Sequence, residues 1–138
     1  MDVNLSKKLE QLIEAGTKRN PLPMVKGNSI RIGKVAIRYS QNKGYILFDC
    51  ESHNQICIAE SKPGALAIAK KYNLDQDIAY TRMYDKEYIK HDNDCAFYEY
   101  TYNNTSDVFK KDLAQIRLEI SKARKHDFYQ KLEAIIFN

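Results

Sequence analysis

Residues 30–72 read IRIGKVAIRYSQNKGYILFDCESHNQICIAESKPGALAIAKKY, and this stretch decides the fold. Apolar side chains recur at strand spacing in three runs, Ile30–Tyr39, Tyr45–Cys50 and Ile56–Ala59, which predicts a three-stranded antiparallel meander. The apolar phase changes at Gly33, so we expect a bulge or bend at that glycine. The turns between the strands fall on two polar segments, Asn42-Lys43-Gly44 and Ser52-His53-Asn54.

One helix is expected before the meander in the sequence and one after it, with the helices on one side of the sheet. Ser61, Lys62 and Pro63 begin the second one, because proline is favoured in the first turn of a helix. Its apolar residues then follow at helical spacing, namely Ala65, Ile68, Ala69 and Tyr72. The same spacing near the N-terminus predicts a helix over residues 5–15. Residues 5–73 are therefore expected to form a helix, a meander and a helix.

The remaining residues divide into an acidic, tyrosine-rich segment and a long helix. In residues 74–104, Ile78–Tyr84 and Cys95–Tyr102 are rich in aromatic and apolar residues, which predicts a further strand pair. The polar stretch Asp85–Asp94 between them is expected to be a loop. In residues 105–138, Ser106 and Asp107 offer an N-cap to a helix over residues 107–136.

Two apolar stripes follow each other along this C-terminal helix. The first has coiled-coil spacing and comprises Phe109, Leu113, Ile116, Ile120 and Ala123. The second comprises Phe128, Leu132, Ile135 and Ile136, and its offset at Lys125-His126-Asp127 predicts a bend or break. Because one small sheet cannot cover both orientations of a straight helix, we expect the second stripe to bind a partner or a second copy.

Length and composition place the chain among globular proteins. With 138 residues, 43% apolar and 29% charged, residues 1–138 are expected to form one α+β domain. Three cysteines are an odd number, which favours free thiols in a reducing, cytoplasmic compartment. No apolar run approaches the ~20 residues that span a bilayer, so no membrane association is expected.

Positive charge is concentrated in the first part of the chain. The net charge is +4, and no acidic residue lies between Glu14 and Asp49. Lysine and arginine without nearby carboxylates are typical of a surface that meets phosphates, an acidic protein surface or only solvent. The candidate nucleic-acid-binding residues are Lys18, Arg19, Arg31, Lys34, Arg38 and Lys43. The meander followed by an alanine-rich helix resembles the layout of the plant AP2 DNA-binding fold, which would imply DNA as the partner.

One pattern suggests catalysis. If the hairpin turns at His53-Asn54, Cys50 opposes Cys57, Asp49 opposes Ile58, and Glu60 and Lys62 share the face of Asp49. Asp49…Glu60-Ser61-Lys62 resembles the D…ExK core of the PD-(D/E)xK nuclease superfamily, which implies hydrolysis of a phosphodiester with a bound Mg²⁺. Phe48 stands where that core has proline, and Pro63 directly follows Lys62.

The other candidate sites have ordinary structural explanations. Cys50 and Cys57 flank His53, but a zinc site needs four ligands, and buried thiols explain both cysteines better. Cys95 lies near His91 in an acidic segment, which discourages a reactive thiolate. We therefore expect no metal and no cofactor.

Three functions remain open at this point. The sequence favours a non-enzymatic protein that contacts nucleic acid, or another acidic surface, through the basic meander. The first alternative is a structural or adaptor subunit of an oligomer or larger assembly that binds through the C-terminal helix. The second alternative is a small metal-dependent nuclease that uses Asp49, Glu60 and Lys62.

Overall fold

The computed structural model describes residues 29–138 as an α+β fold with a four-stranded sheet and three helices. The helix expected at residues 5–15 and the basic residues Lys18 and Arg19 lie outside the described residues. The strands are β1 (Ser29–Ile32), β2 (Val35–Ser40), β3 (Gly44–Asp49) and β4 (Gln55–Ala59). They follow one another in the sheet in chain order, and each neighbouring pair is antiparallel.

The phase change at Gly33 marks a turn and not a bulge, so the first expected strand is in fact two. Gly33 has φ +58°, a left-handed conformation that favours glycine, and Ile32 pairs directly with Val35 across the turn. Asn73 holds this turn from the end of the following helix. Its Nδ2 donates to the carbonyl of Ile32 at 2.9 Å, and its Oδ1 accepts from the amide of Lys34 at 2.8 Å.

The pairing of β3 with β4 differs from the expected register. Leu47 opposes Cys57, and a bulge between Leu47 and Phe48 places Phe48 opposite Gln55. Cys50 lies beyond β3 in a turn that runs to Asn54, where His53 takes a left-handed φ of +64°. The predicted opposition of Cys50 to Cys57 is therefore wrong, because the turn lies earlier than His53-Asn54: the amide of Asp49 donates to the carbonyl of Asn54 at 2.9 Å, so residues 50–53 form the loop.

Helix α2 (Lys62–Asn73) begins and ends as its sequence predicts. The hydroxyl of Ser61 accepts from the amide of Gly64 at 3.0 Å and caps the helix, with Pro63 in the first turn. Residues 63–69 of α2 are all buried, so its first two turns are covered on every side, with Leu66 and Ile68 among the least exposed side chains of the described residues. These side chains share a core with the apolar face of the sheet.

Residues 79–104 form a single helix, so the predicted strand pair and the loop between its strands are wrong. Helix α3 (Ala79–Asn104) covers all of Asp85–Asp94 and most of both expected strands. Helix α4 (Val108–Phe137) is the expected C-terminal helix. Asp107 caps it by accepting from the amide of Lys110 at 3.1 Å, and the helix continues through residues 125–127 without the expected break.

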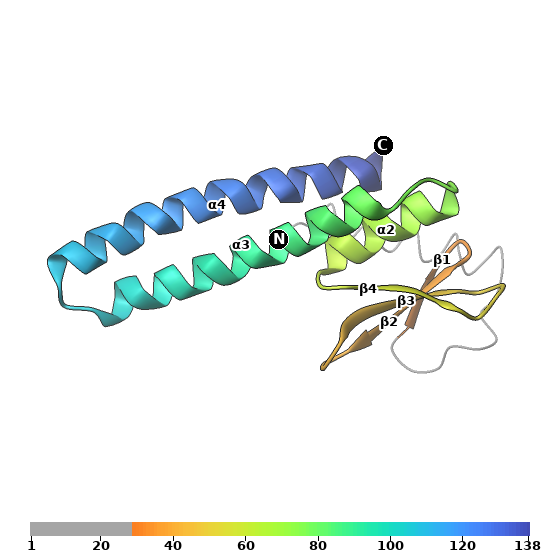
Figure 1. Cartoon of the computed structure of the whole chain (residues 1–138), viewed down its shortest axis with the longest axis horizontal. Coiled ribbons are helices and arrows are strands. Elements are labelled where there is room, and N and C mark those ends of the chain that lie inside the picture. Colours follow the sequence, from red (N-terminus) through yellow and green to blue (C-terminus); the bar gives the residue numbers. More distant parts are fainter. Residues whose placement is uncertain (1–28) are drawn as a thin grey trace.

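Helices α3 and α4 pack against each other as an antiparallel hairpin that extends well beyond the sheet (Figure 1). At 1.5 Å per residue, α3 is about 39 Å long and α4 about 45 Å. The sheet lies on one side of α2, and the beginning of α3 and the end of α4 meet α2 at the same end of the molecule. We call residues 95–121 the outer half of the hairpin, because no strand lies beside them in Figure 1.

Candidate functional site

The basic meander offers less free positive charge than its sequence suggests. Arg31 is only 5% exposed, and its Nε donates to the carbonyl of Gly33 at 2.8 Å. Lys34 forms an ion pair with Asp75 at 2.8 Å, and this hydrogen bond raises the pKa of Lys34. Arg38 and Lys43 are exposed. Of the four candidates in the described part of the meander, two are therefore held by the protein itself.

The residues of the D…ExK pattern lie at opposite ends of the sheet. Ala59 at the end of β4 pairs with Tyr45 at the beginning of β3, whereas Asp49 is the last residue of β3. Four strand residues separate the two levels by about 14 Å. Glu60 and Lys62 therefore cannot join Asp49 around one metal ion. Among residues 29–138, no group of three or more histidine, cysteine or acidic side chains is placed to hold a metal.

Asp49 has a structural environment instead. Its carboxylate accepts from the amides of Glu51 at 2.8 Å and Ser52 at 3.2 Å, and from the hydroxyl of Tyr72. The hydrogen bond from Tyr72 is the main reason that the pKa of Asp49 is lowered, and the same bond raises the pKa of Tyr72. These contacts fix the turn after β3 against the end of α2.

The cysteines are free thiols in unreactive surroundings. Cys57 and Cys95 are buried and Cys50 is half-buried. Burial raises the pKa of each of the three thiols, which keeps them protonated at neutral pH. His91 is buried too, with its ring stacked on Phe128 at 5.7 Å, so it belongs to the packing between α3 and α4.

A buried carboxylate ties the base of α3 to the start of α2. Asp85 is 2% exposed, and its oxygens accept from the amide of Glu60 at 2.7 Å, the amide of Ser61 at 2.9 Å and the hydroxyl of Ser61 at 2.6 Å. A Cβ on Gly64 would lie 1.9 Å from Asp85 Oδ1, so only glycine lets the carboxylate approach. Three donors satisfy this carboxylate, so it is an anchor and not a free acid or base.

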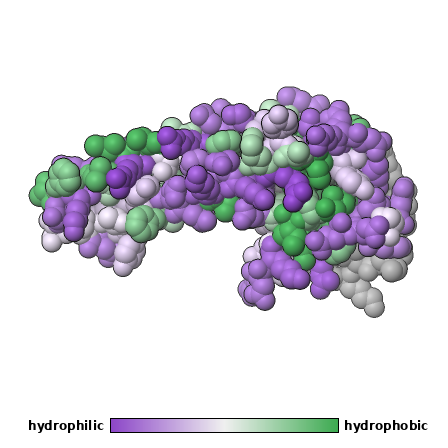
Figure 2. All heavy atoms as spheres, in the orientation of Figure 1, coloured by the Kyte–Doolittle hydropathy of each residue, from purple (hydrophilic) through white to green (hydrophobic). Residues whose placement is uncertain are grey.

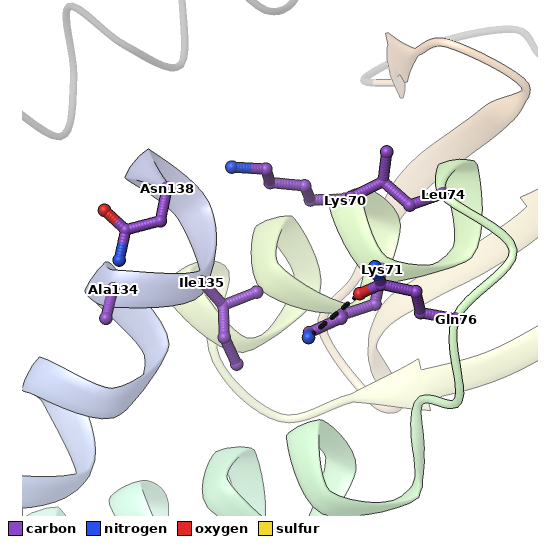
Figure 3. Close-up of a pocket in the computed structure, with 7 residues that line it drawn as sticks. All are labelled: Lys70, Lys71, Leu74, Gln76, Ala134, Ile135 and Asn138. Carbon is purple, nitrogen blue, oxygen red and sulfur yellow. Dashed lines mark hydrogen bonds between the residues drawn. The ribbon is translucent and has the colours of Figure 1, made fainter.

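One open hollow of about 320 Å³ lies where the ends of α2 and α4 meet (Figure 3). Lys70 extends from α2 towards the end of α4, and its ammonium donates to the carbonyl of Ile136 at 3.1 Å. On the other side Lys71 donates to Gln76 at 3.0 Å. Both lysines thus have partners within the protein, and the lining contains no hydroxyl, thiol, imidazole or carboxylate side chain.

The two long helices meet along a seam of small residues, aromatic rings and cations. We call the α4 side of this contact the hairpin seam; its half-buried and buried members are Lys111, Ala114, Leu118, Ser121, Lys125, Phe128 and Leu132. Lys111 lies 4.7 Å above the ring of Tyr102, and Lys125 pairs with Asp92 at 2.7 Å. Near the sheet, Phe128 packs on Tyr84 and Tyr129 on Tyr88.

This packing covers the second apolar stripe of the C-terminal helix with other parts of the same chain. Leu132 is fully buried and Ile136 is 5% exposed, while Phe128 and Ile135 are half-buried against the same core. The residues expected to bind a partner are therefore covered by the protein itself. The expected rotation of the stripe at residues 125–127 needs no break, because different faces of one continuous helix are apolar in its two halves.

The first apolar stripe, in contrast, is largely exposed. We call Phe109, Leu113, Ile116, Ile120 and Ala123 the exposed stripe. It lies outside the hairpin seam, and all of its members except the half-buried Leu113 are exposed. Phe109 is 76% exposed, Ile116 58% and Ile120 46%. Figure 2 shows hydrophobic side chains gathered along the free edge at the far end of the hairpin. Apolar side chains that are exposed in a row along one helix face are typical of an interaction surface.

No protein-family model matches the chain, and no curated protein or solved structure matches it. In the part of the chain that the structure describes, no helix combines the length and the apolar content that a bilayer crossing requires.

Proposed function

We propose that this protein is a non-enzymatic assembly protein, which binds another α-helix through the exposed stripe of α4. The observation that carries the proposal is the exposure of Phe109, Ile116 and Ile120 on a helix whose opposite face is already packed. An amphipathic helix is stabilised chiefly by burial of its apolar face, and here one apolar face has no cover among the described residues.

The hairpin suits this role because it is anchored at one end. Asp85 fixes the base of α3, and Leu132 and Ile136 fix the end of α4 in the core. The outer half then presents the exposed stripe at a distance from the sheet (Figure 1). A helix of a partner can lie along this stripe and exclude water from it without displacing any part of the described fold.

The native size of the protein in extracts of the cells that make it tests the proposal. The wild type should migrate in a complex larger than one chain, and Ile116→Glu should release it as a monomer, because a charge in an apolar interface is strongly unfavourable. Gln115→Glu is the matched control, since it adds the same charge at an exposed neighbouring position. A wild type and an Ile116→Glu variant that both migrate as single chains would refute the proposal.

Nucleic-acid binding is a second candidate function, supported by a row of exposed cations on α3. Arg82, Lys86 and Lys90 follow one another at four-residue spacing and are exposed, as are Arg38 and Lys43 on the sheet. If these residues contact phosphates, log K should fall linearly with log salt, and each lost contact should reduce the slope by about 0.7–0.9. Lys86→Gln with Lys90→Gln should weaken binding, whereas Lys110→Gln on the outer half should not. Binding that is absent at low salt would exclude this function.

A further inference from the structure

The charges beside the exposed stripe follow a strict order. The stripe occupies two positions of each heptad, with Phe109, Ile116 and Ala123 at one and Leu113 and Ile120 at the other. Along one edge, seven residues apart, stand Lys110, Arg117 and Arg124, all exposed cations. Along the other edge, again seven residues apart, stand Asp112 and Glu119, both exposed anions.

This order distinguishes between the two ways in which two copies of α4 can pair. When two identical helices pair in parallel, each residue of the acidic edge meets the residue of the partner's basic edge whose number is higher by five. Asp112 then meets Arg117 of the second copy, and Glu119 meets Arg124. Because the contact is two-fold symmetric, four attractive pairs form. In an antiparallel pair each edge would meet itself, and cations would face cations.

We propose that the occupant of the exposed stripe is a second copy of this chain, with the two α4 helices side by side and parallel. This inference rests on the proposed function and names its partner. Phe109, Ile116 and Ile120 of each copy become buried along the two-fold axis, and the charged edges close over them. The apolar stripe ends at Asp127, the next position in the repeat, so pairing is confined to the part of α4 that projects from the fold.

Arg117 has a second contact that is compatible with this pairing. Its guanidinium lies 6.0 Å from the ring centroid of Tyr98 on α3, which holds the side chain beside the hairpin. Glu119 lies 3.9 Å from Lys122 in an exposed pair, a weak interaction that an intermolecular arginine can replace.

Substitutions that reverse the charges of the two edges test both the identity of the partner and the orientation of the two helices. In purified protein the wild type should be a dimer by sedimentation equilibrium. Asp112→Lys with Glu119→Lys makes both edges basic and should raise the dissociation constant on the order of 100-fold, since four attractive pairs become repulsive. Adding Arg117→Glu and Arg124→Glu to that variant restores opposite edges and should restore the dimer. Circular dichroism verifies that each variant keeps its helices.

A mixing experiment then separates parallel from antiparallel pairing. The variant with all four substitutions is mixed with the wild type. In a parallel dimer these two chains repel each other along both edges, so the mixture should contain two homodimers and no heterodimer. In an antiparallel dimer the same mixture would favour the heterodimer, which would overturn the orientation proposed here.

The failure of this inference is distinguishable from the failure of the proposed function. Purified wild type that stays monomeric at high concentration overturns pairing with a second copy. If the complex in cell extracts nevertheless depends on Ile116, the assembly function stands and its partner is another protein.

Discussion

The two halves of α4 have similar apolar content but opposite surroundings. After Lys125, the apolar side chains face inwards and are buried, as for Leu132 and Ile136. Before Lys125, Phe109, Ile116 and Ile120 face outwards, while the side that faces α3 carries small residues such as Ala114 and Ser121. One helix therefore serves as core at one end and as an exposed surface at the other.

The difference shows that an apolar repeat does not by itself identify the contact that holds a helix in the fold. The outer half of the hairpin is joined through ring–cation contacts and small side chains, which leave the apolar stripe free. The inner half is joined through aromatic rings and the shared core. Substitutions in the two halves should therefore affect different properties, namely stability in the inner half and association in the outer half.

The largest expected contrast is between Leu132→Ala and Ile116→Ala. Leu132 is fully buried, so its truncation leaves a cavity and should lower the free energy of unfolding by about 2–5 kcal/mol. Ile116 is mostly exposed in the monomer, so Ile116→Ala should change it by less than about 0.5 kcal/mol. Urea denaturation at protein concentrations where the chain is monomeric measures both. Equal losses would show that the outer half is core as well, and would break the comparison.

The next effect concerns the anchor of the hairpin. In Asp85→Asn, one of the two acceptor positions becomes an amide NH₂ that faces the donors of Glu60 or Ser61, whichever way the side chain turns. We expect a loss of about 1–3 kcal/mol in the free energy of unfolding, because a buried donor loses its acceptor. Hydrogen exchange at the amides of Glu60 and Ser61 should accelerate at the same time.

Asp127→Asn is the control for this prediction, because it removes the same charge from an exposed position of α4. It should leave both the stability and the two exchange rates unchanged. Unchanged exchange at Glu60 and Ser61 in Asp85→Asn would show that Asp85 does not hold the junction, and that packing alone positions α3.

The parts of the fold that local patterns determine could be predicted from the sequence. Strand alternation identified the sheet, and Ser61 with Pro63 identified the start of α2, because a cap and a first-turn proline act within a few residues. The split of the first strand was visible only as a change of phase at Gly33. The position of Asn73 against that turn, which depends on contacts 39 and 41 residues apart, left no local signal.

Local propensity does not predict helix α3, because its residues favour strands when they are considered alone. Tyrosine, threonine, phenylalanine and cysteine are poor helix formers, and their packing against α4 overrides that preference. A helical signal was nevertheless present, since the residues that face α4 or the core recur three or four positions apart; these include Tyr84, Tyr88, His91, Cys95, Tyr98 and Tyr102. The composition of Cys95–Tyr102 favours a strand, whereas the spacing of these residues across the whole segment favours a helix.

The packing of α3 also decides which stripe of α4 is exposed. The sequence identified the exposed stripe as a repeat, but which stripe of α4 is covered depends on the helix that packs beside it. If residues 79–104 formed strands, no helix would lie beside the stripe after Lys125, and that stripe would need a partner. The structure places α3 and α2 against that stripe and leaves the one before Lys125 uncovered.

The smallest expected effect lies at the boundary between the two halves, where Lys125 pairs with Asp92. This pair is 2.7 Å long and joins α3 to α4 with both side chains partly exposed, at 35% and 47%. Exposed pairs contribute little, so Asp92→Asn should lower the free energy of unfolding by less than about 1 kcal/mol, and less still in high salt. Amide exchange should accelerate mainly in the outer half, because this ion pair joins α3 to α4 just before that half begins.

The pH dependence of this difference identifies the pair as its source. The hydrogen bond from Lys125 to Asp92 raises the pKa of the lysine above its ordinary value of 10.5. A raised pKa in the folded state means that the stabilisation is complete below the unfolded pKa and is lost as the pH rises through the folded one. The wild type should therefore exceed Asp92→Asn in stability at about pH 8, and the difference should shrink by about pH 11. A difference that persists unchanged at alkaline pH would mean that Asp92 acts through packing and not through the charge of Lys125.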